Sequence, residues 1–130
     1  ALDADVISIE NSRNNDKTIK DLTAYGYERD IGPGVYDIHS PVVPTVDEIV
    51  EKLRLFLKHL HPSRVVVNPD WGLKTRQWKE VVPSLRNMVT AASILRAEYE
   101  SNQQHRKNGL ANKNVDSLNK DSEETKGGDA

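Results

Sequence analysis

The chain has 130 residues, of which 36% are hydrophobic, 29% are charged and 5% are aromatic, and its formal net charge is −2. A chain of this length forms one domain or part of one, and its near-neutral charge gives no electrostatic reason to expect nucleic acid or an acidic membrane surface as a partner. The lack of cysteine excludes disulfides and fits a reducing, cytoplasmic compartment, and no apolar run approaches the length of a bilayer span.

The first predicted strand is the β-branched run at residues 4–10 (ADVISIE), which ends in Glu10. A core strand rarely ends in a carboxylate unless that end faces a site, so Glu10 is a candidate functional residue. The plainer alternative is a loop carboxylate that accepts nearby N–H groups. After a loop, Asp16 is placed to cap a short helix with Ile19, Leu22 and Thr23 on one face and Gly26 as its stop.

The second predicted strand is residues 35–38 (VYDI), after a glycine turn at residues 31–34. His39 follows the strand as a candidate acid–base residue, the alternative being a histidine bonded to the backbone. Asp37 could orient His39 or bond a neighbouring loop, and the first role is slightly favoured.

The clearest helix comes next, because Thr45 and Glu48 have the Thr-x-x-Glu spacing of a capping box. Apolar residues then recur at helical spacing on one face, namely Ile49, Val50, Leu53, Phe56, Leu57 and Leu60.

Residues 65–67 (VVV) predict a buried third strand, which stops at the turn signal of residues 68–70. Trp71 would point into the edge where this strand ends. Lys74 and Arg76 could bind an anionic group, but a solvated rim is about as good an interpretation.

A last helix after Thr75 would bury one apolar face, made of Val82, Leu85, Val89, Ala92 and Leu95. Trp78 is expected to be a core residue or an anchor at the start of this helix. The helical pattern fades near Tyr99. Residues 100–130 are mostly polar and cannot offset their ordering entropy, so we predict a disordered tail, although a helix to about Lys107 is compatible with the pattern.

The predicted order is βαβαβα with crossovers long enough for parallel strands. We therefore expect an α/β fold in which residues 1–99 form three βα units of a partial (β/α)₈ TIM barrel or half of a doubly wound sheet. A complete barrel takes about 250 residues, so the rest of the barrel would be needed. The strand at residues 4–10 would lack a neighbour on one side, and the isolated chain should aggregate or recruit a partner.

Three motifs together resemble the C-terminal part of cobalamin-independent methionine synthase, the family of 5-methyltetrahydropteroyltriglutamate–homocysteine S-methyltransferases. They are residues 5–13 (DVISIENSR), 31–41 (IGPGVYDIHSP) and 68–76 (NPDWGLKTR). The resemblance covers residues 1–98 and implies the last three βα units of a catalytic (β/α)₈ barrel. It also implies transfer of a methyl group from methyltetrahydrofolate polyglutamate to homocysteine, giving methionine.

The resemblance assigns roles to three positions. Glu10 matches a zinc ligand, His39 matches the proton donor to the leaving amine, and Trp71 stands where the family has a zinc-binding cysteine. The family's other two zinc ligands, a His and a Cys, would lie upstream of Ala1, and the resemblance assigns no substrate-binding residue here.

Trp71 departs from the family pattern, and the departure affects the metal. An indole nitrogen offers no lone pair, whereas a catalytic zinc needs about three protein ligands. We therefore expect this chain to bind zinc weakly or not at all and to be inactive alone. The alternative function is a non-catalytic remnant or interaction module that has lost the zinc site.

Overall fold

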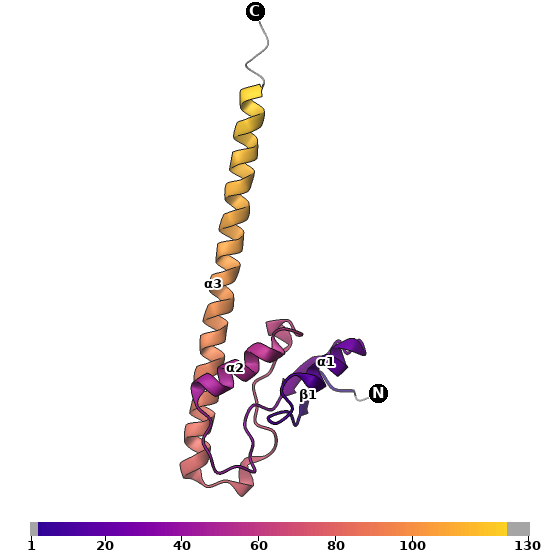
Figure 1. Ribbon diagram of the computed structural model, residues 1–130, viewed down its shortest axis with the longest axis vertical. Coiled ribbons are helices and arrows are strands. Elements are labelled where there is room, and N and C mark those ends of the chain that lie inside the picture. The colour runs from indigo at the N-terminus through magenta and orange to yellow at the C-terminus, as the bar shows by residue number, and fades with distance from the viewer. Residues whose placement is uncertain (1–2, 125–130) are drawn as a thin grey trace, which may run out of the picture. The chain divides into compact units, whose positions relative to one another are not determined.

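The computed structural model describes the backbone of residues 3–124 and the side chains of residues 3–110. It divides into two compact units, Ala1–Leu95 and Arg96–Ala130. The main elements are β1 (Val6–Ile9), α1 (Lys17–Ala24), β2 (Asp30–Pro33), α2 (Val46–Phe56) and α3 (Trp78–Glu124), and single 3₁₀ turns occur at Pro62–Arg64 and Leu73–Thr75 (Figure 1).

The strands form a small parallel sheet. β1 pairs with β2 in parallel, with Val6 opposite Asp30. Residues 65–68 lie on the other side of β2, where Ile31 and Gly34 make isolated parallel bridges to Val65 and Asn68. The first strand and the parallel direction are thus confirmed, while the predicted third strand is reduced to two bridges. The fold is α/β and is consistent with part of a (β/α)₈ barrel.

The predicted second strand was misplaced. The strand is β2, made largely of residues expected to form a turn, and residues 35–38 lie beyond it. Val35, Tyr36 and Ile38 are nevertheless buried in the core. Val35 donates its N–H to the Asn68 carbonyl at 3.0 Å, and the Tyr36 carbonyl accepts from Asp70 at 3.0 Å. The apolar run therefore indicated burial beside residues 65–68, the third segment of the sheet, rather than a strand of its own.

Helix α2 follows its predicted pattern. Thr45 and Glu48 form the capping box, and Ile49, Val50, Leu53 and Phe56 are buried. α1 ends as predicted near Gly26, whose φ is +76°. Asp16 is the N-cap residue of α1, as predicted, but its side chain makes no cap hydrogen bond. Asp16 instead pairs through Oδ2 with Nε2 of His59, 2.8 Å away.

Helix α3 buries largely a different face from the predicted one, of which only Leu95 packs against the core. Val81, Ser84, Met88 and Ala91 are buried, whereas Trp78, Val82, Leu85 and Val89 are exposed. Both faces carry apolar residues, and the sequence pattern alone could not tell which of them meets the core.

The predicted disordered tail of residues 100–130 is also corrected, because α3 is helical as far as Glu124. Residues 125–130 of that prediction lie outside the described residues. A helix that is already nucleated gains one hydrogen bond for each residue it adds, which favours extension past the expected limit at Lys107. Among the residues that the structure describes, no helix is long and apolar enough to cross a membrane.

Candidate functional site

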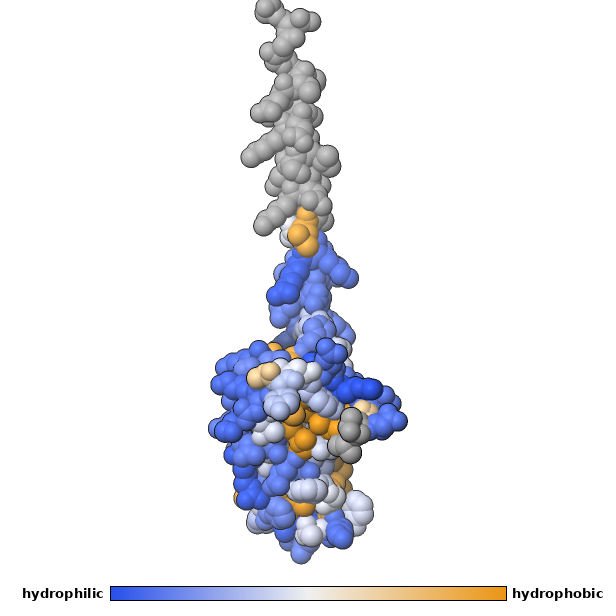
Figure 2. All heavy atoms as spheres, turned by 90° about the vertical axis from the view of Figure 1, so that its right-hand side faces the viewer, coloured by the Kyte–Doolittle hydropathy of each residue, from blue (hydrophilic) through white to orange (hydrophobic). Residues whose placement is uncertain are grey.

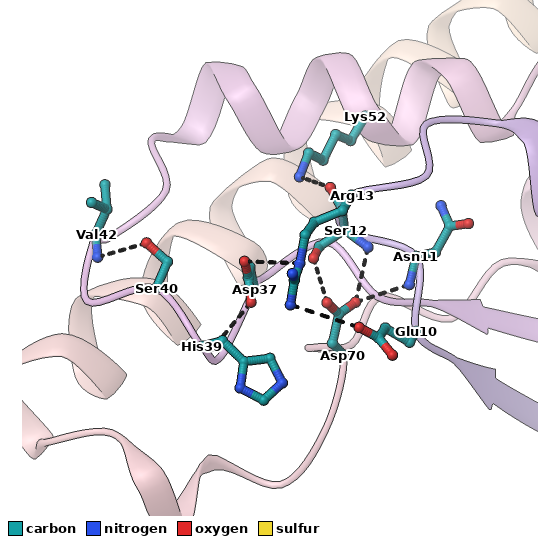
Figure 3. Close-up of polar contacts among 10 residues, drawn as sticks. All are labelled: Glu10, Asn11, Ser12, Arg13, Asp37, His39, Ser40, Val42, Lys52 and Asp70. Atoms are coloured by element: carbon teal, nitrogen blue, oxygen red, sulfur yellow. Dashed lines mark hydrogen bonds and ion pairs between the residues drawn. The ribbon is translucent and has the colours of Figure 1, made fainter.

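Asp70 joins the loop after β1 to the segment that carries Trp71. The residue is buried, with an exposed fraction of 4%. Oδ1 accepts the backbone N–H groups of Asn11 at 3.0 Å and Ser12 at 2.9 Å, and Oδ2 accepts the Ser12 hydroxyl (Figure 3). Buried carboxylates persist where charge-assisted hydrogen bonds offset their desolvation. These hydrogen bonds form a clamp that fixes the loop at residues 10–15, the Glu10 loop, against residues 68–71.

Glycines in and after β2 make the clamp possible. A Cβ built on Gly34 would lie 1.9 Å from Oδ1 and 2.7 Å from Cα of Asp70, and one on Gly32 would lie 2.0 Å from Oδ1 of Asn68. A side chain at either position would push residues 68–70 away. The glycines that we expected to form a turn therefore permit close approach of the third segment.

Arg13 joins the Glu10 loop to the His39 loop. Its Nε lies 3.2 Å from Oδ2 of Asp37, and its Nη2 lies 3.9 Å from Oε1 of Glu10. The other Asp37 oxygen accepts the backbone N–H of His39 at 2.9 Å (Figure 3). Asp37 therefore makes both predicted contacts. It bonds the neighbouring loop through Arg13, and it holds the backbone, not the imidazole, of His39.

The residues predicted as a metal site do not fit zinc. Glu10 is exposed and pairs with Arg13, and the Trp71 side chain, 57% exposed, has only a donor nitrogen. Within the described part of the chain, no three His, Asp or Glu side chains are grouped so that they could hold a metal ion. The donor set is therefore too small for a catalytic zinc.

A cavity of about 280 Å³ lies beside the Arg13–Asp37 pair, and Glu48 and Lys52 of α2 also line it. Lys52 reaches across to the Ser12 carbonyl (Figure 3). The two cations and two carboxylates in the lining balance each other in charge, so the cavity shows no preference for an anion or a cation.

The two cations after residues 65–70 differ in exposure. Lys74 is exposed, which favours the solvated-rim interpretation for that residue. Arg76 is largely buried, and its Nη1 lies 3.9 Å from Oε2 of Glu80. Trp78 begins α3 but is exposed, so the prediction of a core residue was wrong.

Sequence reasoning missed the two residues that assemble the site, Asp70 and Arg13. Both lie inside the recognised motifs, so a signal was present. Asp70 was interpreted as a turn residue and, with Trp71, as a strand end capable of chemistry, but its clamping role was not foreseen, because its hydrogen-bond partners lie almost 60 residues earlier in the chain.

Comparison with known proteins identifies the origin of these motifs. The family described as "Cobalamin-independent synthase, Catalytic domain" matches residues 1–94. The 5-methyltetrahydropteroyltriglutamate–homocysteine methyltransferase of Thermosynechococcus vestitus is 55% identical over 97 residues, which is 75% of this chain and 13% of that protein. The corresponding protein of Syntrophotalea carbinolica is 58% identical over 95 residues, 73% of this chain and 12% of its own length.

A solved structure has the same fold. The B12-independent methionine synthase from Shewanella sp. W3-18-1, in complex with selenomethionine, superposes with a TM-score of 0.68 at 20% identity, over 76% of this chain and 28% of that one. The chain spans about one eighth of the length of the two curated relatives described above. Its motifs and its fold agree, and the chain belongs to the catalytic-domain family of the cobalamin-independent methionine synthases.

Proposed function

We propose that this chain supplies the Glu10–His39 edge of a methionine synthase barrel. The reaction of the complete barrel would transfer a methyl group from methyltetrahydrofolate polyglutamate to the sulfur of homocysteine, giving methionine in the cytoplasm. One observation carries the proposal: Asp70 and the Arg13–Asp37 pair tie the three recognised motifs together at one edge of the sheet.

In this proposal His39 is the proton donor. The N5 amine of the folate is a poor leaving group unless it is protonated, and imidazole can supply that proton near neutral pH. Asp37 would act as a positioning residue, since it holds the backbone at His39 and is itself held by Arg13. As the methyl–nitrogen bond breaks, the proton from His39 would pass to the folate nitrogen, and the methyl group would form its new bond to the sulfur of homocysteine, which must react as the thiolate, with its own proton already lost.

Trp71 sets the limit of the proposal. An indole cannot replace a thiolate as a metal ligand, so we assign no step to zinc in this chain and expect no methyl transfer by the chain alone. The same residue favours the second candidate function, a non-catalytic remnant or interaction module that has kept the scaffold.

A chimera separates the two functions. The segment of the Thermosynechococcus vestitus methyltransferase that matches this chain is replaced by residues 1–94, either unchanged, with Trp71→Cys or with Trp71→Ala. We expect zinc content and methyl transfer to be recovered only in the Trp71→Cys chimera. The Trp71→Ala chimera removes the indole without adding a thiolate, so it controls for steric blockage.

A further substitution tests the role of His39. In the active chimera, His39→Gln should lower kcat by about 10²–10⁴-fold, the range for general acid catalysis, with zinc content unchanged. A folded Trp71→Cys chimera that stays inactive would favour the non-catalytic remnant instead.

A further inference from the structure

The cavity that Arg13 and Asp37 line is separate from the proposed catalytic edge, because Glu10, His39 and Trp71 are not among its lining residues. Three segments of the first unit form it, namely the loop after β1, the segment between β2 and α2, and the first half of α2 (Figure 3). Its volume of about 280 Å³ lies just below the range of about 300–1,000 Å³ that is typical for drug-sized ligands. An occupant of this cavity would therefore be a smaller molecule.

The two cations of the lining lie at the same loop and keep unused donors. Nζ of Lys52 donates to the Ser12 carbonyl at 2.5 Å, and Arg13 is the next residue of that loop. Nε of Arg13 pairs with Asp37, whereas its Nη2 lies 3.9 Å from Oε1 of Glu10, beyond hydrogen-bond distance. A lysine has three N–H donors and an arginine five, so both cations can still donate to a ligand carboxylate.

The two carboxylates of the lining keep unused acceptors in the same way. One oxygen of Asp37 accepts the His39 N–H at 2.9 Å and the other pairs with Nε of Arg13 at 3.2 Å. Both hydrogen bonds from Thr45 go to Oε2 of Glu48. Since an ionised carboxylate offers about four lone-pair sites, both groups can still accept from a ligand ammonium group.

Apolar side chains complete the lining. They belong to Val35, Val42 and Pro44, of which Val42 is 69% exposed. Figure 2 shows that the surface of the first unit is mostly hydrophilic, with apolar patches between the polar side chains. An apolar wall beside paired charges fits a ligand that joins a short aliphatic group to a charged end.

We propose that this cavity binds a free α-amino acid with a short aliphatic side chain. The ligand carboxylate would bind Lys52 and Arg13, and its ammonium group would bind Asp37 and Glu48. A zwitterion suits this site because it brings one charge of each sign to a lining whose own charges balance, whereas a simple ion would leave one charge uncompensated. The proposal concerns binding alone and does not depend on methyl transfer.

Titration of the full 130-residue chain, labelled with ¹⁵N, with L-valine tests the proposal by NMR. The backbone amide of His39 is the reporter, because it donates to Asp37 at the cavity. We expect a saturable change in its chemical shift with a Kd on the order of 1 mM, since so small a ligand makes few contacts. L-valinamide lacks the carboxylate and 3-methylbutanoate lacks the ammonium group, so each should bind at least about tenfold more weakly.

Substitutions in the lining provide the second measurement. Lys52→Met removes one cation and should weaken L-valine binding at least about tenfold. Lys58→Met, at an exposed lysine outside the lining, is the matched control and should leave the Kd unchanged. Because Lys52 also contacts the Ser12 carbonyl, Val42→Trp is a further variant at an exposed position. The larger side chain should obstruct the cavity, whereas Val42→Ala should not.

Three results would overturn the proposal. If L-valinamide or 3-methylbutanoate binds as tightly as L-valine, the cavity recognises a single charge and not a zwitterion. If Lys52→Met and Val42→Trp keep their circular dichroism spectra and leave the Kd unchanged, the ligand binds elsewhere. The third result is the absence of a saturable shift up to about 20 mM L-valine, a concentration well above the expected Kd.

Discussion

Asp70 is the side chain on which the arrangement of the site depends. Three donors from the loop after β1 converge on its buried carboxylate, and Gly34 leaves the space that the carboxylate occupies. A buried charge without these partners would be strongly unfavourable. The clamp therefore has two requirements, the donors of the Glu10 loop and the missing side chain at position 34.

Replacing Gly34 with alanine should disturb the clamp. The new Cβ would collide with the side chain and the backbone of Asp70, so Gly34→Ala should lower the free energy of unfolding in urea by about 1–3 kcal/mol, the usual range for overpacking. Gly72→Ala is the matched control, because a Cβ there meets nothing within 4 Å and φ is −62°. Equal effects of the two substitutions would show that the close approach at Gly34 is not a constraint.

In helix α2 the capping hydrogen bonds and the burial of apolar side chains stabilise the same first turn. The Glu48 carboxylate accepts from the backbone N–H of Thr45 at 2.7 Å and from its hydroxyl at 2.9 Å. The backbone bond, followed by the hydroxyl bond, holds the pKa of Glu48 below its ordinary value of 4.5. The first turn of α2 is thereby fixed where the helix begins to bury Ile49 and Val50.

The lowered pKa of Glu48 predicts how stability depends on pH. The ionised group stabilises the folded chain fully above its ordinary pKa, and this stabilisation is lost as the pH falls through the lower folded-state value. Glu48→Gln should therefore lower Tm at pH 7, and the difference from the unchanged chain should shrink as the pH falls below the ordinary pKa of 4.5. Glu51→Gln, on the exposed side of α2, is the control, and a difference for Glu48→Gln that is independent of pH would contradict the prediction.

The molecule as a whole consists of a packed α/β unit and a polar helical extension. Among the side chains that the structure describes, residues 3–110, those of the core lie at or before Leu95, and the second unit begins at Arg96. The stability of the first unit should accordingly come from its own core.

Deleting residues 100–130 tests this division. The shortened chain should keep its free energy of unfolding within about 0.5 kcal/mol, as expected for changes that remove no core contact, while its helical circular dichroism signal falls. Urea unfolding followed by tryptophan fluorescence measures the first quantity, because Trp71 and Trp78 both remain. A loss of several kcal/mol would mean that the extension contributes to the core.

Local sequence patterns were sufficient to predict helix α2, to place helix α1 and to identify the three family motifs. In each case the deciding interactions lie within a few residues of one another, as with Thr45 and Glu48, so the spacing in the sequence contains them. The same motifs were sufficient to name Glu10 and His39 as candidate residues, and the missing lone pair of Trp71 follows from its chemistry alone.

Three other features depended on contacts between segments far apart in the chain. Residues 31–34 look like a turn until residues 68–70 pack against their glycines, and Asp70 looks like a turn residue until its partners in the Glu10 loop are in place. α3 has two apolar faces, and only its packing on the core selects Met88 and Ala91 over Val82 and Val89. The physical reason is the same each time: local spacing records which residues are apolar or flexible, whereas the neighbour that each one meets is set by the folded chain.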